Sequence, residues 1–565
     1  MRSDLLEGSP RWAVRRAEWR ALGISDEEMA RPKVAIVNSS SDMAACFSHL
    51  DDIVPVLRQH LRDQGLLPFE VRTIAPSDFI TSAGRGGRYI LPSRDIITNS
   101  IEAVVEGAQL DGMICLASCD KTAPAQMMAG VRLDIPTVIV SCGYQRNAHY
   151  EDGGADIEDV FLKSSHNAVQ GGQIDLKSLS EDAIRGPGVC AGLGTANSMH
   201  IAAEALGLAV PGSTPVRANS DRMWADVEAA AGALATQIRE GLTPRRIVTP
   251  NAVANAVRVM LSIGASINSV KHLQAIAVEA GLDVDVWELF RTLGREVPVL
   301  AAVRPNGPAH VEDFEDCGGA ATIMRELAPQ LNLDALTVTG VPLGDVIGAA
   351  PAADGTVIAS YEKPMRSDAV LRIVRGNLAE DGAIVKLPVL ENRSMTFSGP
   401  ARIFHSREEG IDALAAGLVQ AGDVVVLRGI GLIGGPGMGM ASALVFALDG
   451  SGLGDQVAVV TDGQLSGLVN KGIVVGEVSP EAAVGGAIGL IQNGDLIDID
   501  LESGRVDVRL TEDELAARPP FQAVDQVRTD GLLDAYRATV TPLSCGAVLC
   551  GGSGRGICTR AEEEK

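Results

Sequence analysis

The chain has 565 residues, and its 48 basic against 72 acidic side chains give a formal net charge of −24. That length exceeds what one hydrophobic core supports, so we expect two large domains. The acidic balance disfavours nucleic acid and anionic membranes as partners, and a hydrophobic content of 46% excludes general disorder. Nine cysteines without an evident secretion signal favour reduced thiols and metal ligation over a disulfide framework.

The first half of the sequence alternates between helical and strand-like segments. Within residues 11–30, an arginine-rich helix is predicted to end near Leu22-Gly23, and Ser25 is predicted to cap the next helical turn. These residues lack the apolar run of a targeting peptide, so we expect a cytoplasmic protein. Helical spacing appears over 51–64. Short apolar strands are predicted at 34–37, 69–74, 110–116 and 135–141. This alternation is typical of a doubly wound parallel sheet.

Three cysteines lie in loops beside these elements. Cys46 follows the strand at 34–37, Cys119 follows the strand at 110–116, and Cys190 lies in a glycine-rich turn before a helix. Open α/β sheets bind ligands at the carboxyl ends of their strands. At Cys119-Asp120-Lys121 a thiol, a carboxylate and an amine could serve a soft and a hard metal side by side. Taken alone, the same residues are as readily a buried cysteine beside a surface ion pair.

The pattern changes along the rest of the chain. Residues 150–185 are polar and poorly periodic, which predicts a long loop with short helices, and helices dominate from 199 to 331. The composition shifts near 349–355, so we place an α/β domain at 1–355 and a β-rich domain at 356–565. No charge occurs from 429 to 448, but its glycines and Pro436 favour a loop and a short buried helix over a membrane span.

The C-terminal tail carries three further cysteines, Cys545, Cys550 and Cys558. Their spacing matches neither a zinc site nor a ferredoxin site. A flexible or packed tail with free thiols and a metal or redox role both stay open.

Short motifs follow one another in order along almost the whole chain. They include Ser77-Asp78, Leu91-Pro-Ser-Arg94, Cys119-Asp-Lys121, Gly194-Thr-Ala-Asn-Ser-Met199, Gly376-Asn377, Gly434-Gly-Pro-Gly-Met438, Thr461-Asp-Gly-Gln-Leu-Ser-Gly467 and Val478-Ser-Pro-Glu-Ala482. This series resembles the dihydroxy-acid and sugar-acid dehydratase family, a group of iron-sulfur hydro-lyases. The resemblance implies a cluster-binding α/β domain under a swivelling β-barrel, a small hydroxy-acid substrate, and a homodimer or homotetramer.

The resemblance also implies how the three loop cysteines are used. Cys46, Cys119 and Cys190 match the family's ligands to an iron-sulfur cluster, for which [2Fe-2S] is the expected type. Three thiolates leave one iron position open, and that iron can act as a Lewis acid on a leaving hydroxyl. The intervals between the cysteines carry no motif of their own, so this assignment depends on the resemblance and on their loops.

A second metal and a base are implied by the same resemblance. Asp78, Asp120 and Lys121 match Mg²⁺ ligands, with the lysine expected as a carbamate that also belongs to the catalytic set. A carbamate turns a cationic amine into the anionic oxygen donor that a hard metal requires. Ser466 matches the base that removes the C2 proton of a 2,3-dihydroxy acid, whose enol product becomes a 2-oxo acid.

One departure from the family pattern makes Mg²⁺ doubtful. Met440 stands where the family has a further glutamate ligand, and a thioether cannot replace a carboxylate on Mg²⁺. Ile430, Val469 and Glu477 also replace other residue types, and Glu477 could supply the missing carboxylate. We therefore expect a dehydratase with a specialised substrate. The alternative is a divergent paralogue that keeps the fold and cluster but has lost metal-assisted dehydration and serves another reaction or an interaction role.

Overall fold

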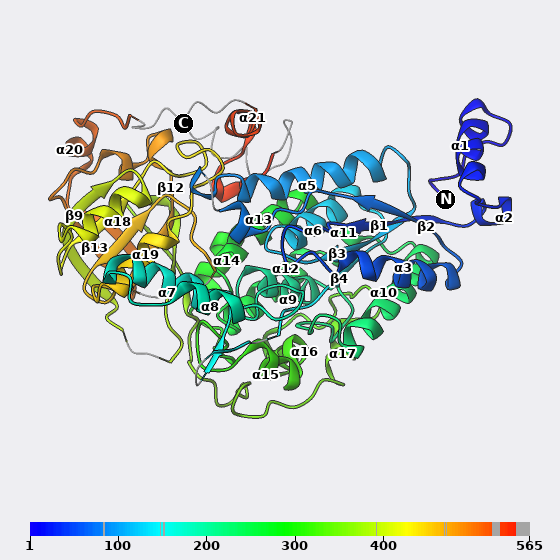
Figure 1. Cartoon of the computed structure of the whole chain (residues 1–565), viewed down its shortest axis with the longest axis horizontal. Coiled ribbons are helices and arrows are strands. Elements are labelled where there is room, and N and C mark those ends of the chain that lie inside the picture. The colour runs from blue at the N-terminus through cyan, green and yellow to red at the C-terminus, as the bar shows by residue number, and fades with distance from the viewer. Residues whose placement is uncertain are drawn as a thin grey trace.

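A four-stranded parallel sheet organises the first half of the chain, with strand order β2-β1-β3-β4 (Figure 1). The structure is a computed structural model that describes residues 1–82, 85–146, 148–150, 153–390, 393–467, 469–470, 472–522 and 531–549. The strands of this sheet are β1 (Lys33–Asn38), β2 (Leu67–Arg72), β3 (Gly112–Ala117) and β4 (Thr137–Ser141). Every residue of β1, β3 and β4 is buried, because helices cover both faces.

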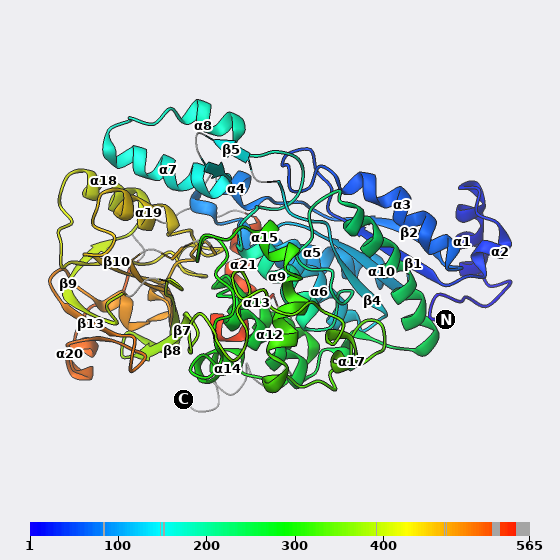
Figure 2. The same cartoon turned by 90° about the horizontal axis from the view of Figure 1, so that it is seen from below.

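Two pairs of helices cover the sheet. On one face α3 (Leu50–Asp63) packs against α10 (Asp221–Glu240), and on the other α5 (Ile90–Val105) packs against α6 (Thr122–Leu133) (Figure 2). Behind α6 lies α13 (Asn268–Ala280), which is buried along its whole length. The predicted doubly wound parallel sheet is confirmed.

The remaining elements of the first half surround this layer. They are α1 (Pro10–Ala21), α2 (Asp26–Met29), α4 (Asp78–Thr81), β5 (Ala148–Tyr150), β6 (Gly153–Ala155), α7 (Ile157–Gln170), α8 (Leu176–Asp182), α9 (Thr195–Ala205), α11 (Pro244–Ile247), α12 (Pro250–Ser262), α14 (Val286–Leu293), α15 (Val311–Asp316), α16 (Gly319–Glu326) and α17 (Leu343–Ile347). Ser25 caps α2 through a capping box, as its sequence predicts. The helical character of 199–331 is also confirmed.

A closed eight-stranded barrel forms the second half, in the order β10-β11-β12-β8-β7-β14-β13-β9. Its strands are β7 (Leu371–Gly376), β8 (Ala379–Lys386), β9 (Thr396–Phe404), β10 (Val424–Leu427), β11 (Ala458–Thr461), β12 (Ile473–Ser479), β13 (Leu496–Asp500) and β14 (Arg505–Val508). The helices around it are α18 (Arg407–Ala415), α19 (Ser442–Gly450), α20 (Glu512–Ala516) and α21 (Leu532–Thr539). Valine and isoleucine side chains pack a separate core here. The predicted barrel is confirmed, and the division at residue 355 stays a prediction.

The uncharged stretch 429–448 forms a loop that leads into α19, as predicted. Among the described helices, none combines the length and apolar character that a bilayer crossing requires.

Residues 150–185 differ from the predicted loop, because they contain the fourteen-residue helix α7. Asp156 caps this helix by accepting hydrogen bonds from the N–H groups of Glu158 and Asp159. The helix packs against α19 of the second half, where Gln170 donates a hydrogen bond to the Gly450 carbonyl. Because that partner lies far along the chain, local periodicity does not predict α7.

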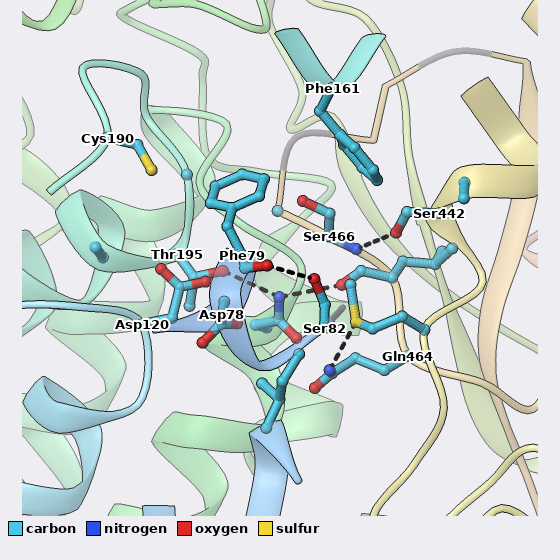
Figure 3. Close-up of a pocket in the computed structure, with 18 of the residues that line it drawn as sticks. Asp78, Phe79, Ser82, Asp120, Phe161, Cys190, Thr195, Ser442, Gln464 and Ser466 are labelled. Carbon is cyan, nitrogen blue, oxygen red and sulfur yellow. Dashed lines mark hydrogen bonds between the residues drawn. The ribbon is translucent and has the colours of Figure 1, made fainter. Parts of the chain in front are cut away.

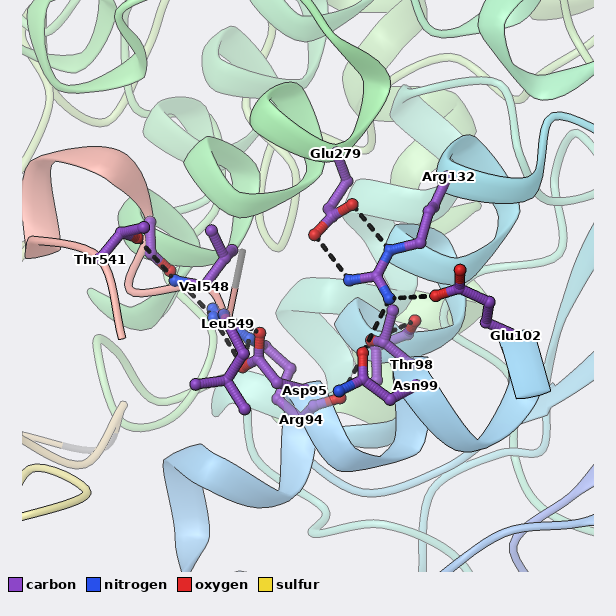
Figure 4. Close-up of polar contacts among 12 residues, drawn as sticks. Arg94, Asp95, Thr98, Asn99, Glu102, Arg132, Glu279, Thr541, Val548 and Leu549 are labelled. Carbon is purple, nitrogen blue, oxygen red and sulfur yellow. Dashed lines mark hydrogen bonds and ion pairs between the residues drawn. The ribbon is translucent and has the colours of Figure 1, made fainter. Parts of the chain in front are cut away.

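The segment after α21 returns to the first half and packs on α5 and α13 (Figure 4). Arg94 and Asp95 are fully buried there. Arg94 donates hydrogen bonds to the carbonyls of Gly546, at 2.9 Å, and Ala547, and Asp95 accepts the Leu549 N–H at 3.0 Å. We call residues 541–549 the C-terminal strap. The strap contains the buried Cys545, whereas Cys550 and Cys558 lie outside the described residues.

Candidate active site

A cavity of about 370 Å³ is lined by residues from both halves of the chain (Figure 3). Five of the seven predicted site residues line it: Asp78, Cys119, Asp120, Cys190 and Ser466. The other two lie next to it: Cys46 is hydrogen-bonded to Cys119, and Lys121 donates a hydrogen bond to Asp78. One cavity therefore brings together residues from loops that are far apart in the sequence.

The three thiols gather beside this cavity. Cys46 lies in the loop after β1 and Cys119 directly follows β3, so both stand at the carboxyl end of the sheet. Hydrogen bonding to Cys46, followed by burial, raises the pKa of Cys119. Burial and the charge of Asp120 raise the pKa of Cys190, to which Cys46 also contributes. The thiols are thus close enough to perturb one another, and the raised pKa values of Cys119 and Cys190 favour their protonated forms until a cationic group binds them.

These thiols fit an iron-sulfur cluster in donor type and grouping. Within the described ranges, no three His, Cys, Asp or Glu side chains are arranged to hold a single metal ion. A two-iron cluster does not require three protein ligands on one metal ion, because each iron takes at most two thiolates. The backbone at the loops is fixed as well, since Asn197 donates to the Cys190 carbonyl at 2.9 Å and Ser118 donates to the Cys46 carbonyl.

Two carboxylates and one lysine form the acidic part of the site. Lys121 is 1% exposed and donates to Asp78 Oδ2 at 3.1 Å. Burial alone would lower the pKa of Lys121, but the charges of Asp78 and Asp120 outweigh it and raise that pKa. Burial and the neighbouring Asp78 raise the pKa of Asp120 to about 7. Asp78 Oδ1 is buried and, among the described residues, has no hydrogen-bond donor. A cation at this point would satisfy that oxygen and relieve the repulsion.

Ser466 lies in the loop that follows β11 and faces the cavity from the barrel side. Its N–H donates to Ser442 Oγ at 2.7 Å, and Asn268 donates to the Leu465 carbonyl at 3.2 Å. A Cβ on Gly467 would come within 2.4 Å of Ser266 Oγ, so only glycine lets this loop approach the first half so closely. The serine is therefore held by contacts from both halves.

The substituted residues do not restore the missing acid. The sulfur of Met440 lines the cavity and accepts a hydrogen bond from Gln464 at 2.9 Å. Glu477 forms an ion pair with Lys271, both side chains are fully buried, and Glu477 is not among the cavity-lining residues. Ile430 is likewise absent from the lining. The idea that Glu477 supplies the missing carboxylate is therefore wrong for this arrangement.

An aromatic wall closes one side of the cavity. Phe79 and Phe161 meet edge to face with ring centroids 6.0 Å apart, and Phe161 meets Phe446 in the same way at 5.2 Å. Phe79, Phe161 and Ile411 give the cavity an apolar side, and the charged Arg407 and Glu408 of α18 also belong to the lining. This wall links α4, which begins at Asp78, through α7 to α19.

Several residues that build the site were not predicted from the sequence. Asn268 and Ser442 position the serine loop, and Phe161 belongs to the helix that was missed. The polar run Ser266-Ile-Asn-Ser269 inside an apolar helical region was a usable signal, because buried polar groups require partners. Ser442 and Phe161 carried no such local signal.

Comparisons with known proteins cover nearly the whole chain. Residues 31–346 match the family model described as dihydroxy-acid/6-phosphogluconate dehydratase N-terminal, and residues 356–547 match the corresponding C-terminal model. The chain is 40% identical over 554 residues to the dihydroxy-acid dehydratase of Methanothrix thermoacetophila, covering 97% of this chain and 100% of the relative. The dihydroxy-acid dehydratase of Methanococcoides burtonii is 38% identical over 556 residues, with the same coverage.

Proposed function

The chain belongs to the dihydroxy-acid/6-phosphogluconate dehydratase family, and from that membership we propose that it is a hydro-lyase that converts a 2,3-dihydroxy carboxylic acid into a 2-oxo acid. The observation that carries this proposal is the single cavity shared by Cys119, Cys190, Asp78, Asp120 and Ser466. It places thiols, carboxylates and a hydroxyl around one space large enough for a small acid. The homo-oligomeric state and the cytoplasmic location stay predictions.

The thiols and carboxylates have separate parts in this proposal. Cys46, Cys119 and Cys190 would hold an iron-sulfur cluster, and Asp78 and Asp120 a divalent cation; when bound, these groups supply Lewis acidity at the leaving hydroxyl and positive charge at the substrate carboxylate. Lys121 balances the two carboxylates through its bond to Asp78. Carbamate formation at Lys121 requires that its ammonium group lose a proton, and the ion pair with Asp78 opposes this loss.

Ser466 is proposed as the base. In its alkoxide form it accepts the C2 proton and becomes a hydroxyl, while the C2–H electron pair forms the C2–C3 double bond and hydroxide leaves C3. That hydroxide and the proton released earlier from the serine make the water, and the enol tautomerises to the 2-oxo acid. A serine hydroxyl is a weak base by itself, so its surroundings must favour the alkoxide.

The substrate is proposed to be a specialised one. The apolar wall of Phe79, Phe161 and Ile411 favours a substituent without further hydroxyls, because a buried hydroxyl without a partner is costly. Met440 lines the cavity at the position where the family pattern has a glutamate. The same methionine favours the second candidate function, a paralogue that keeps the fold and thiols but no longer dehydrates a hydroxy acid.

An anaerobic assay across a panel of 2,3-dihydroxy acids and sugar acids tests the proposal. We expect 2-oxo acid from at least one substrate, and we expect Ser466→Ala to lower kcat by at least about 10²-fold. Ser178→Ala, which removes an exposed hydroxyl, serves as the control. Absence of product from the whole panel, with the visible absorption of a cluster present, would favour the paralogue instead.

A further inference from the structure

Lys386 is a buried lysine next to the serine loop. It is the last residue of β8, its side chain is 5% exposed, and its Nζ donates to the Gly467 carbonyl at 3.3 Å. Among the described residues, this carbonyl is its one hydrogen-bond acceptor. Gly467 immediately follows Ser466, so the contact reaches the backbone of the proposed base.

The acidic residue that interacts with Lys386 comes from the helix that the sequence did not predict. Glu158, in the first turn of α7, attracts Lys386, and its Oε2 is buried without a hydrogen-bond partner in the described part of the chain. Asp156 repels Glu158, whereas Arg304 attracts it and donates to Asp159 at 2.9 Å. The lysine thus interacts with both the serine loop and the acidic N-terminus of α7.

A lysine buried in this way lowers the stability of the fold. Burial lowers the pKa of Lys386 to about 7, and the charge of Glu158 offsets this only in part. A methionine of similar length would fill the same space without losing a hydration shell. A local conflict of this kind beside an active-site loop points to a functional role.

The lysine has a physical task that the other loop contacts do not perform. Ser442 binds the Ser466 N–H and Asn268 binds the Leu465 carbonyl, so both fix the loop without bringing a charge. Lys386 binds the Gly467 carbonyl and, in its protonated form, brings positive charge to the loop without lining the cavity. A positive charge near a hydroxyl favours its alkoxide, which the proposed dehydration requires.

We propose that Lys386 is a positioning residue for Ser466. Lys386 fixes the Gly467 carbonyl and holds positive charge near the serine loop while Ser466 accepts the C2 proton. The inference rests on the proposed function, because it assigns a role within that reaction. Lys386 does not touch the cavity; it acts through the loop.

The test compares three lysine variants on the substrate that the wild-type protein dehydrates. Lys386→Met removes the donor and the charge, Lys386→Gln keeps a donor without the charge, and Lys363→Met removes an exposed lysine as the control. We expect Lys386→Met to lower kcat by about 10²-fold with little change in KM, and Lys386→Gln to lower it by about 10-fold. The control should match the wild-type protein.

Two further readouts separate positioning from a merely structural effect. In Lys386→Met the acid limb of the kcat profile should move to higher pH by about one unit, because the alkoxide loses its favourable charge. A deuterium at C2 should slow this variant more than the wild-type protein, since proton removal becomes the slow step. Circular dichroism and visible absorption establish that each variant is folded and loaded.

The outcomes distinguish the two proposals. Wild-type activity together with unchanged kcat and an unchanged acid limb in Lys386→Met would overturn the inference alone. A wild-type protein that forms no 2-oxo acid from any substrate of the panel would overturn the proposed function and the inference with it. If Lys386→Met fails to fold, Lys386→Gln decides, because unchanged kcat and pH profile in that variant would overturn the role of the charge.

Discussion

The buried pair of Lys271 and Glu477 joins α13 of the first half to β12 of the barrel. Both side chains are fully buried, and Lys271 also donates to Asn268, which donates to the Leu465 carbonyl beside Ser466. We predict that Lys271→Met is strongly destabilising, because it leaves the Glu477 carboxylate buried without its cation.

The expected size follows from this burial. Removing one partner of a buried ion pair costs about 3–5 kcal/mol, most of it the penalty for the charge left behind. Lys271→Met combined with Glu477→Gln removes that charge and should recover at least about 2 kcal/mol. Glutamine suits the site, because residue 477 has a φ of 56° and a β-branched replacement would add backbone strain.

Urea unfolding followed by tryptophan fluorescence measures the effect, with the buried Trp287 as one reporter. The control is Lys177→Met, whose lysine is 88% exposed and lies 4.0 Å from Glu181. An exposed pair of this kind contributes about 0–1 kcal/mol, so the control should unfold like the wild-type protein. If Lys271→Met were within about 1 kcal/mol of the wild-type protein, or the double variant were no more stable than the single one, the reasoning would be refuted.

Three other predictions concern the site. Burial, with repulsion from Asp156, raises the pKa of Glu158 from 4.5 to about 8, so its contribution to stability is full below pH 4.5 and is lost as pH rises through 8. The free energy of unfolding should therefore fall more between pH 5 and pH 8 in the wild-type protein than in Glu158→Gln; equal slopes would contradict this. Met440→Glu should bind Mg²⁺ at least about 10-fold more tightly than the wild-type protein by calorimetry, because it adds a carboxylate to the cavity. One Mg²⁺ held tightly by the unaltered protein would show that the methionine matters little. Cys119→Ser should lose the visible absorption that anaerobic reconstitution with iron and sulfide gives, whereas Cys317→Ser should keep it; a coloured Cys119→Ser would remove Cys119 from the ligand set.

Local sequence patterns were sufficient to predict those secondary-structure elements that are apolar and regular. The strands at 34–37 and 110–116 were predictable because every residue of β1 and β3 is buried, which produces a continuous apolar run. The motifs around Cys119 and Ser466 were predictable only through their resemblance to a family. Their meeting in one cavity depends on contacts across hundreds of residues, which no window of the sequence contains.

The residues that the sequence did not predict depend on partners far away in the chain. The helix α7 packs on α19, almost 300 residues later in the chain, and Lys386 is a single lysine at the end of a strand. The sequence predicts a candidate metal ligand at Glu477, because this carboxylate lies in a segment that carries site motifs. Its partner Lys271 lies 206 residues earlier, so the sequence alone did not show that this acid is already paired.

The C-terminal strap has a consequence for how the protein is made. Arg94 and the carbonyl of Gly546 are separated by 452 positions, and translation at 5–20 residues per second places them about 20–90 s apart at the ribosome. Until residues 546–549 emerge, the guanidinium and its neighbour Asp95 lack the backbone groups that bind them. The first half of the chain is thus completed by residues synthesised more than 400 positions later, and a chain that stops short of residue 546 would leave these two buried charges without their backbone partners.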